Sequence, residues 1–178
     1  QQPDMLASML LLQGEQLWHG AAPNLPESYQ QAINGLVIGP QVGSCGTAAF
    51  LQEPIVVTDI AIDPLWQDYR DIALTHGLRA CWSVPIFSRT GEILGTFAQY
   101  HHYPYEPSTQ DWALVNIAVK LAGLAIEQAH SDDALRESAD RFRAIFEQAA
   151  VGICQVSLEG RLMRVNQRLC ELLGYPCG

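Results

Sequence analysis

Apolar residues form short alternating runs in the first hundred positions and one long helical run after residue 108. Strands are predicted for residues 6–13, 16–19, 55–58, 80–87 and 92–100, with tight turns joining the first two and the last two as hairpins. Shorter helices are predicted for residues 26–33, 47–51 and 65–76. Hairpins mixed with separate helices predict an α+β domain.

Local signals set several of these boundaries. Asp63 is a candidate N-cap with Pro64 at the first helical position, and Gly77 suits the left-handed residue that ends a helix. Residues 35–46 are predicted as a loop, in which residues 43–46 form a flexible approach to the helix at 47–51.

One long helix is predicted to begin at Ser108, where Asp111 supplies a carboxylate three residues into the helix. Its apolar residues recur at helical spacing: Leu114, Ile117, Leu121, Leu124 and Ile126. The helical pattern continues through a more polar stretch to Phe146. Sparse apolar residues in a charged helix are typical of a coiled-coil connector, so we expect a homodimer through the Ser108 to Phe146 helix.

A second unit is predicted from about Arg141 onward. It contains a helix, two strands at residues 151–157 and 161–165, and a short last helix capped by Asn166. Two strands are too few to bury a sheet face by themselves. We therefore expect this unit to be an incomplete domain.

Charge and hydropathy exclude two classes of partner. The formal net charge is -9, and no cluster of Lys and Arg interrupts the acidic background. Nucleic-acid binding is not expected, because phosphate contacts need such clusters. No purely apolar run approaches the roughly 18–20 residues of a membrane helix. We therefore predict no membrane contact by this chain and a cytoplasmic location.

The chain has five cysteines, an odd number at irregular spacing and without a CxxC pair. This pattern predicts neither a disulfide framework nor a zinc site, and no other metal site is predicted. The simplest interpretation is that the cysteines are small buried apolar residues in a reducing compartment.

Several ordered motifs carry a family resemblance. Residues 39–49 (GPQVGSCGTAA), 63–66 (DPLW), 77–86 (GLRACWSVPI) and 91–98 (GEILGTFA) resemble a GAF sensor domain over about residues 5–130. Residues 139–153 (ADRFRAIFEQAAVGI) resemble the opening of a PAS domain. Such pairs occur in bacterial multidomain sensor histidine kinases and diguanylate cyclases.

The resemblance implies an antiparallel sheet of five or six strands, flanked by helices, with a pocket on one sheet face. The expected organisation is a GAF domain at residues 1–130 that lacks its N-terminal helix, a helical connector at 131–146 and a partial PAS domain at 147–178. The output domain, a histidine kinase or a diguanylate cyclase, is expected to lie outside this chain.

Known activities of GAF domains can be compared with this sequence. The Asn-Lys-Phe-Asp-Glu signature of cyclic-nucleotide binders is absent. Residues 99–103 hold no cysteine for a bilin pigment, and His101 and His102 are interpreted as a polar strand end. Free methionine-(R)-sulfoxide reductases share the stretch at residues 45–48, but their attacking cysteine falls in a region matching residues 70–78, where this chain has none. We therefore expect no catalysis.

What remains is a pocket hypothesis without an identified cofactor. Cys45 precedes a short helix, whose free N–H groups favour a thiolate, and Cys81 shares a sheet face with Ser83. The candidate ligand-binding or redox residues are Cys45, Gly46, Thr47, His76, Cys81 and Ser83. The alternative is that the cysteines only pack and that His76 is a helix-end cation.

The sequence therefore predicts a regulatory input module that binds an unidentified small molecule or responds to redox state. The signal would pass along the long helix of a dimer. The alternative function is a ligand-free dimerisation and spacer domain, which a closed apolar core would favour.

Overall fold

The computed structural model describes residues 5–174, so Cys177, one of the five cysteines, lies outside the described residues. Cys170 is disulfide-bonded, which the spacing of the cysteines did not predict, whereas Cys45, Cys81 and Cys154 are free. Contacts divide the chain into two units, residues 1–127 and 128–178. Each unit is described by itself.

The first unit is built on a six-stranded antiparallel sheet with the order β3-β2-β1-β6-β5-β4. Its strands are β1 (Met5–Gln13), β2 (Gln16–Ala21), β3 (Leu36–Val37), β4 (Ile55–Val57), β5 (Ala80–Phe87) and β6 (Ile93–His101). The predicted α+β class, the antiparallel sheet and both hairpins are confirmed. The short strand β3 was not predicted.

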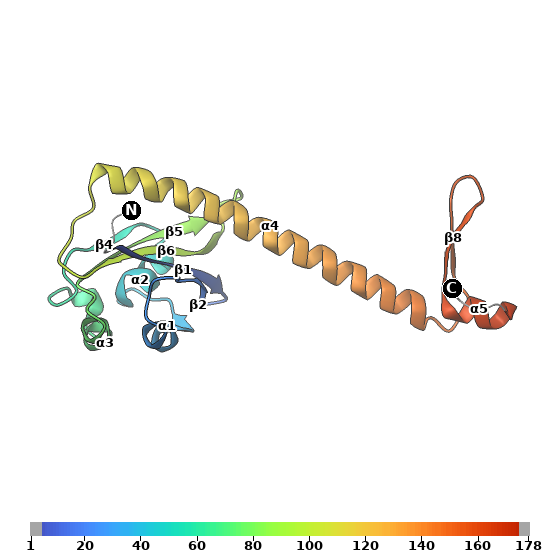
Figure 1. The fold of residues 1–178 in the computed structure, drawn as a ribbon, viewed down its shortest axis with the longest axis horizontal. Helices are drawn as coiled ribbons and strands as arrows, with labels where there is room; N and C mark the ends of the chain where they lie inside the picture. Colours follow the sequence, from blue (N-terminus) through green and yellow to red (C-terminus); the bar gives the residue numbers. More distant parts are fainter. Residues whose placement is uncertain (1–4, 175–178) are drawn as a thin grey trace. The chain divides into compact units, whose positions relative to one another are not determined.

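Helices cover both faces of this sheet (Figure 1). One face carries α1 (Glu27–Ile33), α2 (Gly43–Leu51), the 3₁₀ turn η1 (Pro64–Trp66) and α3 (Arg70–Thr75). The other face is covered by the first part of α4 (Thr109–Gln148), the predicted long helix.

Alternation along the strands gives each face its own core. Cys81, Ala98 and Tyr100 point to the face under the short helices, together with Leu10 of β1. Trp82, Val84 and Phe97 point the opposite way, where they pack against α4 through the residues Trp112, Val115 and Val119. The central strands are therefore buried on both faces.

Two predicted helix starts are confirmed by their caps. Asp63 accepts a hydrogen bond from the backbone N–H of Leu65 at 2.9 Å. At the start of α4, the Ser108 hydroxyl accepts from the Asp111 N–H at 3.3 Å, and the Ser108 N–H donates to the Asp111 carboxylate at 2.8 Å. This reciprocal pair is a capping box.

The helix predicted for residues 65–76 is wrong as one element, because it is divided into η1 and α3. Trp66 turns inward to donate from Nε1 to the Ser44 hydroxyl at 3.1 Å. Arg70 then closes the turn by donating to the carbonyls of Ile60 and Asp63. Burial of the indole, a tertiary contact, decides this break.

The start of α2 was also predicted wrongly. The helix begins at Gly43, so Cys45 lies in its first turn and does not precede it. A side chain at Gly46 would meet Val42, with its Cβ only 2.5 Å from the Val42 Cγ1. Close packing of the preceding loop therefore explains the glycine that suggested flexibility.

The second unit contains the end of α4, the hairpin β7 (Cys154–Val156) and β8 (Leu162–Val165), and α5 (Gln167–Leu173). Asn166 caps α5 as predicted, accepting from the Leu169 N–H at 3.0 Å. Its buried amide also donates to the carbonyls of Phe146 and Val151. One asparagine thus ties the end of α4 to the hairpin and to α5.

The expectation about membrane-spanning length needs one correction. An 18-residue window within α4 reaches a mean hydropathy of 1.2 with few charges, which meets the length and composition of a membrane span. Only 17% of that window is buried within the protein. The apolar residues of this helix fall on two faces, one against the sheet and one exposed.

Candidate functional site

A small cavity of about 20 Å³ lies between the sheet and the short helices of the first unit. This volume accommodates about one water molecule. Its lining residues are Leu10, Tyr29, Ile33, Leu36, Val42, Gly43, Ser44, Cys45, Trp66, Tyr69 and Tyr100. The lining is mainly apolar, but one thiol and several hydroxyls project into it.

Two buried thiols meet beside this cavity. The Cys45 sulfur lies 3.7 Å from the Tyr100 hydroxyl oxygen. Cys81 of β5 is the direct cross-strand partner of Tyr100 in β6, so both cysteines are neighbours of one tyrosine. Ser44 reinforces this arrangement, because its hydroxyl donates to the Cys81 carbonyl at 3.0 Å.

Three buried hydroxyls lie on the sheet face that carries Cys81, and two of them, Ser83 and Thr96, are close to Cys45. Ser83 and Thr96 extend from β5 and β6 on the same face as Cys81, and Ser8 lies opposite Ala98 in β1. Within residues 5–174, these three hydroxyls have no hydrogen bond of standard geometry. Buried polar groups without partners are costly, so their presence on one enclosed sheet face calls for an explanation.

The electrostatics single out Cys45 as the thiol that ionises first. Hydrogen bonding from the Cys81 thiol is the main cause that lowers the pKa of Cys45 to about 7; Ser83, Tyr100 and Thr96 add to it, while burial opposes it. The pKa of Cys81 is raised, first by burial and then by the neighbouring Cys45. The pair therefore consists of a potential thiolate and a neutral thiol that donates to it.

Both tyrosines of the cluster remain neutral donors. Burial raises the pKa of Tyr100 and of Tyr29 well above the ordinary value, and the nearby Cys45 raises both further. Their rings meet edge to face at 5.8 Å. Neutral phenols next to the sulfur can stabilise a thiolate by donation, but they cannot neutralise its charge.

The predicted site residues do not all gather at the cavity. Cys45, Cys81 and Ser83 come together as described. Gly46 and Thr47 secure the start of α2 instead, since the Thr47 hydroxyl accepts from the Val42 N–H at 3.1 Å.

His76 lies at the edge of the cluster and does not line the cavity. Its Nε2 lies 2.8 Å from the Ser28 hydroxyl, and its Nδ1 lies 2.8 Å from the Ile72 carbonyl oxygen. Because a carbonyl only accepts, Nδ1 carries the proton and donates to it. The His76 ring also contacts Tyr29 with 5.5 Å between ring centroids, so it supports a cavity residue from behind.

Sequence reasoning missed most of the cavity wall. Ser44 and Trp66 lay within motifs that had been noted, and Tyr100 follows from the alternation of β6 once its inner face is known. Tyr29 gave no local signal, because only the packing of α1 on the sheet brings it to Tyr100.

Metal binding has no support at this cluster. Among residues 5–174, no three His, Cys, Asp or Glu side chains are placed to hold a metal ion together. The chemistry available is hydrogen bonding from hydroxyls and reaction at sulfur.

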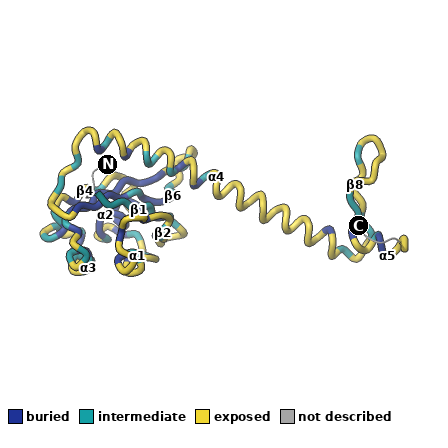
Figure 2. The backbone as a smooth tube through the Cα atoms, in the orientation of Figure 1, coloured by how far each residue is buried: buried dark blue, intermediate teal, exposed yellow. Residues whose placement is uncertain are grey.

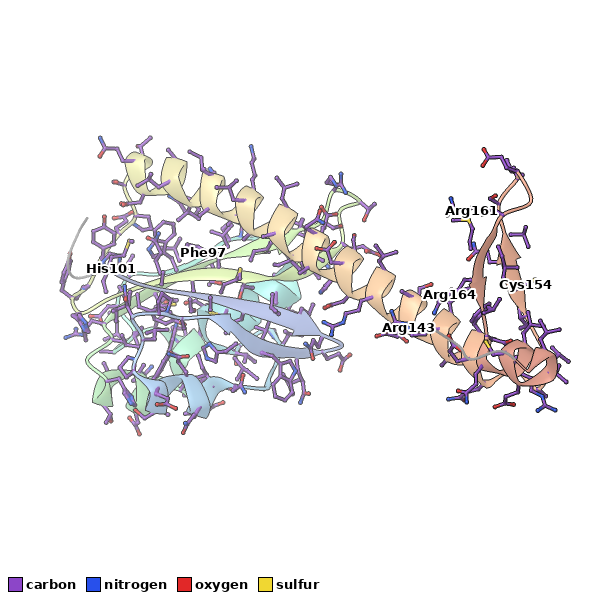
Figure 3. All side chains as sticks on the ribbon, turned by 45° about the vertical axis from the view of Figure 1, so that its right-hand side comes forward. Phe97, His101, Arg143, Cys154, Arg161 and Arg164 are labelled. Carbon is purple, nitrogen blue, oxygen red and sulfur yellow. The ribbon has the colours of Figure 1, made fainter. Side chains whose placement is uncertain are left out.

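The opposite sheet face holds a second polar residue of interest, His101, which was interpreted as a polar strand end. The side chain is in fact buried, with 1% exposed, and its ring stacks on Tyr105 with 4.0 Å between centroids. Phe97 and His101 both lie on the side of the sheet that α4 covers (Figure 3). Folding of the Pro-rich loop over β6 buries the ring, which local sequence could not indicate.

Burial of His101 predicts an acid-sensitive interface between sheet and helix. Burial lowers the pKa of His101, opposed by the Asp111 carboxylate, whereas the nearby His102 lowers it further. The unfolded chain therefore binds the proton more readily, and the free energy of unfolding should fall as pH drops below about 6.5. In His101→Phe, which keeps the stacked ring, we expect a smaller loss.

Urea unfolding at about pH 7.5 and about pH 5.5 measures this difference for both chains. His19, whose pKa is also lowered by burial, contributes equally to both and cancels in the comparison. An unchanged pH dependence in His101→Phe would contradict the assignment.

A larger groove of about 290 Å³ lies at the far end of the sheet, between α4 and the β5–β6 turn. Its walls include Lys120, Gly123 and the ion pair between Arg89 and Glu127, 3.1 Å long. The Arg89 side chain is mostly exposed, and such pairs contribute little. We therefore place the candidate site at the smaller cavity, where reactive groups converge.

Comparison with protein families gives two matches. A family model for the GAF domain matches residues 4–126, and a model for the PAS domain matches residues 140–177. A methyl sulfide methyltransferase-associated sensor from Methanosarcina acetivorans is 39% identical over 176 residues. That alignment covers 97% of this chain but only 18% of the relative, so the chain spans less than a fifth of its length.

Solved structures show the same fold at low sequence identity. A domain assigned to a two-component sensor histidine kinase from Sinorhizobium meliloti is 22% identical with a TM-score of 0.60, covering 74% of this chain and 84% of that one. The type II free methionine-R-sulfoxide reductase from Thermoplasma acidophilum is 16% identical with a TM-score of 0.56, covering 70% and 79%. These likenesses establish the fold alone.

Proposed function

The chain belongs to the GAF domain family and continues into the start of a PAS domain, and from this premise we propose that it is a signal-sensing input module. The proposal places the sensed chemistry at the Cys45 cavity and the transmitting element in α4. We assign residues 1–130 to the GAF domain, 131–146 to the connector and 147–178 to the PAS unit. The sensor relative supports this class of function.

The main support for this function is that strand β5 contacts the candidate site on one face and α4 on the other. In β5, Cys81 lies on the sheet face that holds the cavity, and the next residue, Trp82, faces α4. Trp82 meets Trp112 of α4 edge to face, with 5.1 Å between ring centroids. A shift of β5 at the thiol therefore reaches the packing of the helix within one residue.

Such a shift carries information only if the helix has two arrangements and the signal favours one of them. The contact between β5 and α4 is small, so a change in helix position would disrupt few buried side chains. Trp82, Val84 and Val115 form its buried part. At the far end, Gly123 brings α4 close to the Phe87 carbonyl, so α4 is held on the sheet by an aromatic contact at one end and a close backbone contact at the other.

The partner we propose for α4 is a second copy of the chain. Its exposed apolar residues are Leu114, Ile117, Leu121, Leu124, Leu135, Phe142 and Ile145. They all fall on the first and fourth positions of one seven-residue repeat, the spacing of a coiled-coil seam. Figure 2 colours most of α4 as exposed. In a parallel dimer each seam residue, Gln128 included, meets its own counterpart.

The complete signalling protein is proposed to be cytoplasmic and to carry a histidine kinase or diguanylate cyclase output outside this chain. This rests on the sensor relative and on the fold shared with a sensor histidine kinase domain. The reductase activity of the Thermoplasma relative is not proposed here. Residues 70–78 contain His76 but no cysteine to attack a sulfoxide.

A second candidate function is the ligand-free dimerisation and spacer domain. The small volume of the cavity, about 20 Å³, favours it over binding of a large ligand. The buried hydroxyls at Cys45 argue the other way, because a pure spacer gains nothing from polar groups in its core.

The test compares the chain as purified under non-reducing conditions with the same chain after treatment with reductant. Native mass spectrometry gives the oligomeric state and any bound mass, and hydrogen exchange follows the amides of residues 109–127. We expect a dimer whose α4 exchanges differently in the two states. A monomer would contradict the proposal, and a bare dimer with identical exchange would establish the spacer function instead.

A further inference from the structure

The hydroxyl cluster around Cys45 is unusual for the core of a small domain. Ser83, Thr96 and Tyr100 lie next to one sulfur, and within residues 5–174 the first two have no hydrogen bond of standard geometry at all. A buried sulfur that only packs needs no such donors. Donors aimed at one atom stabilise negative charge there, as in sites that form an anion during a reaction.

The position of Cys45 in the fold adds to this effect. It lies in the first turn of α2, a nine-residue helix whose free N–H groups favour a negative charge. Cys81 is held beside it by the β5–β6 register and by the Ser44 bond to its carbonyl. Cys45 is therefore the thiol next to hydrogen-bond donors, and Cys81 is the thiol placed to react with it.

Resting on the proposed input module, we propose that Cys45 and Cys81 are a redox pair: a small hydroperoxide oxidises Cys45, and Cys81 then closes a disulfide between α2 and β5. The cavity admits a molecule little larger than water, so hydrogen peroxide is the oxidant that fits. Organic hydroperoxides with bulky groups do not.

The chemistry balances in two steps. The Cys45 thiolate attacks one peroxide oxygen, the O–O bond breaks, and a sulfenic acid forms while the leaving hydroxide takes up a proton to become water. The Cys81 sulfur then attacks the Cys45 sulfur, the S–O bond breaks, and the hydroxide leaves with the Cys81 proton as a second water. Two thiols supply the two electrons that reduce one peroxide.

The disulfide changes the strand that α4 contacts. In the reduced state, Cys45 and Cys81 are two separate buried thiols that both neighbour Tyr100. Closing the bond draws the first turn of α2 and the start of β5 together, next to Trp82 on the opposite face. Reduction by a dithiol reverses the change, as a signal requires.

The experiment treats the intact chain with hydrogen peroxide and maps its cysteines by mass spectrometry. Trypsin cleaves after Arg70, Arg79 and Arg89, which places Cys45 and Cys81 in separate peptides. We expect a linked pair of peptides, two hydrogens lighter than their sum, that dithiothreitol separates. Cumene hydroperoxide at the same dose should link them far more slowly.

Two variants identify the roles of the two cysteines. In Cys81→Ser, we expect the Cys45 sulfenic acid to persist after the peroxide is removed and to be trapped when the chain is then unfolded in the presence of dimedone. In Cys45→Ser, we expect Cys81 to remain unmodified at the same dose. Circular dichroism verifies that both variants fold, and the exposed thiol of Cys154 reports the oxidant dose within each sample.

Absence of the linked peptides, with Cys45 still a free thiol after peroxide has modified Cys154, would overturn the redox pair. Equal oxidation of Cys81 in Cys45→Ser would also overturn it. Neither result bears on the proposal that the chain is an input module. That proposal is contradicted separately if the chain is a monomer or if hydrogen exchange in α4 is the same in both states.

Discussion

Replacing Gly95 by alanine should destabilise the first unit by about 3 kcal/mol or more. Gly95 lies in β6, where it pairs with Leu11 on one side and Ile86 on the other. A Cβ at this position would lie only 2.0 Å from the Leu10 carbonyl oxygen. Backbone atoms of a central strand cannot rotate away, so β1 or β6 must shift.

Gly91→Ala is the matched control for this substitution. Gly91 has a positive φ of +86°, but no atom lies within 4 Å of its added Cβ. It should cost only about 1 kcal/mol, the strain of a left-handed residue. Urea unfolding followed by tryptophan fluorescence measures both, and equal losses in the two variants would contradict the close approach of β1 to β6.

The second large effect is expected at the exposed seam of α4. Leu121→Glu combined with Leu135→Glu should convert the proposed dimer into a monomer. These side chains are 61% and 71% exposed in the single chain, and a coiled coil would bury both. Four leucines per dimer at about 1.5 kcal/mol each give roughly 6 kcal/mol, or about four decades in Kd.

The control places the same two charges outside the seam, as Asn116→Glu with His130→Glu. Both residues are exposed, and both lie at the third position of the same seven-residue repeat. Sedimentation velocity across a range of concentrations should show the control as a dimer and the seam variant as a monomer. If both variants keep the oligomeric state of the unmutated chain, α4 is not the interface.

Only part of the evidence for these predictions could be found in the sequence. The seam of α4 was visible as a period of apolar residues, because helical spacing is a local property. The sequence did not show that the seam residues are exposed, since Val115 and Ile126 follow a similar pattern and are buried. Only the packing of α4 on the sheet separates the two faces.

The candidate site was predicted in part for the same reason. Strand alternation put Cys81 and Ser83 on one face, and the glycine-flanked motif placed Cys45 near a helix start. Neither pattern could bring Tyr29 or Tyr100 to the sulfur. The helix at residues 65–76 was wrong because burial of Trp66 outweighs the helical propensity of its neighbours.

The α+β class, both hairpins, the long helix and the caps at Asp63, Ser108 and Asn166 could be predicted from sequence, because each depends on neighbours a few residues apart. The tertiary structure alone decided which face of each strand is enclosed, how α2 begins, and that His101 is buried. These features depend on contacts between residues far apart in the chain. The two thiols therefore become a pair only when α2 packs on β5.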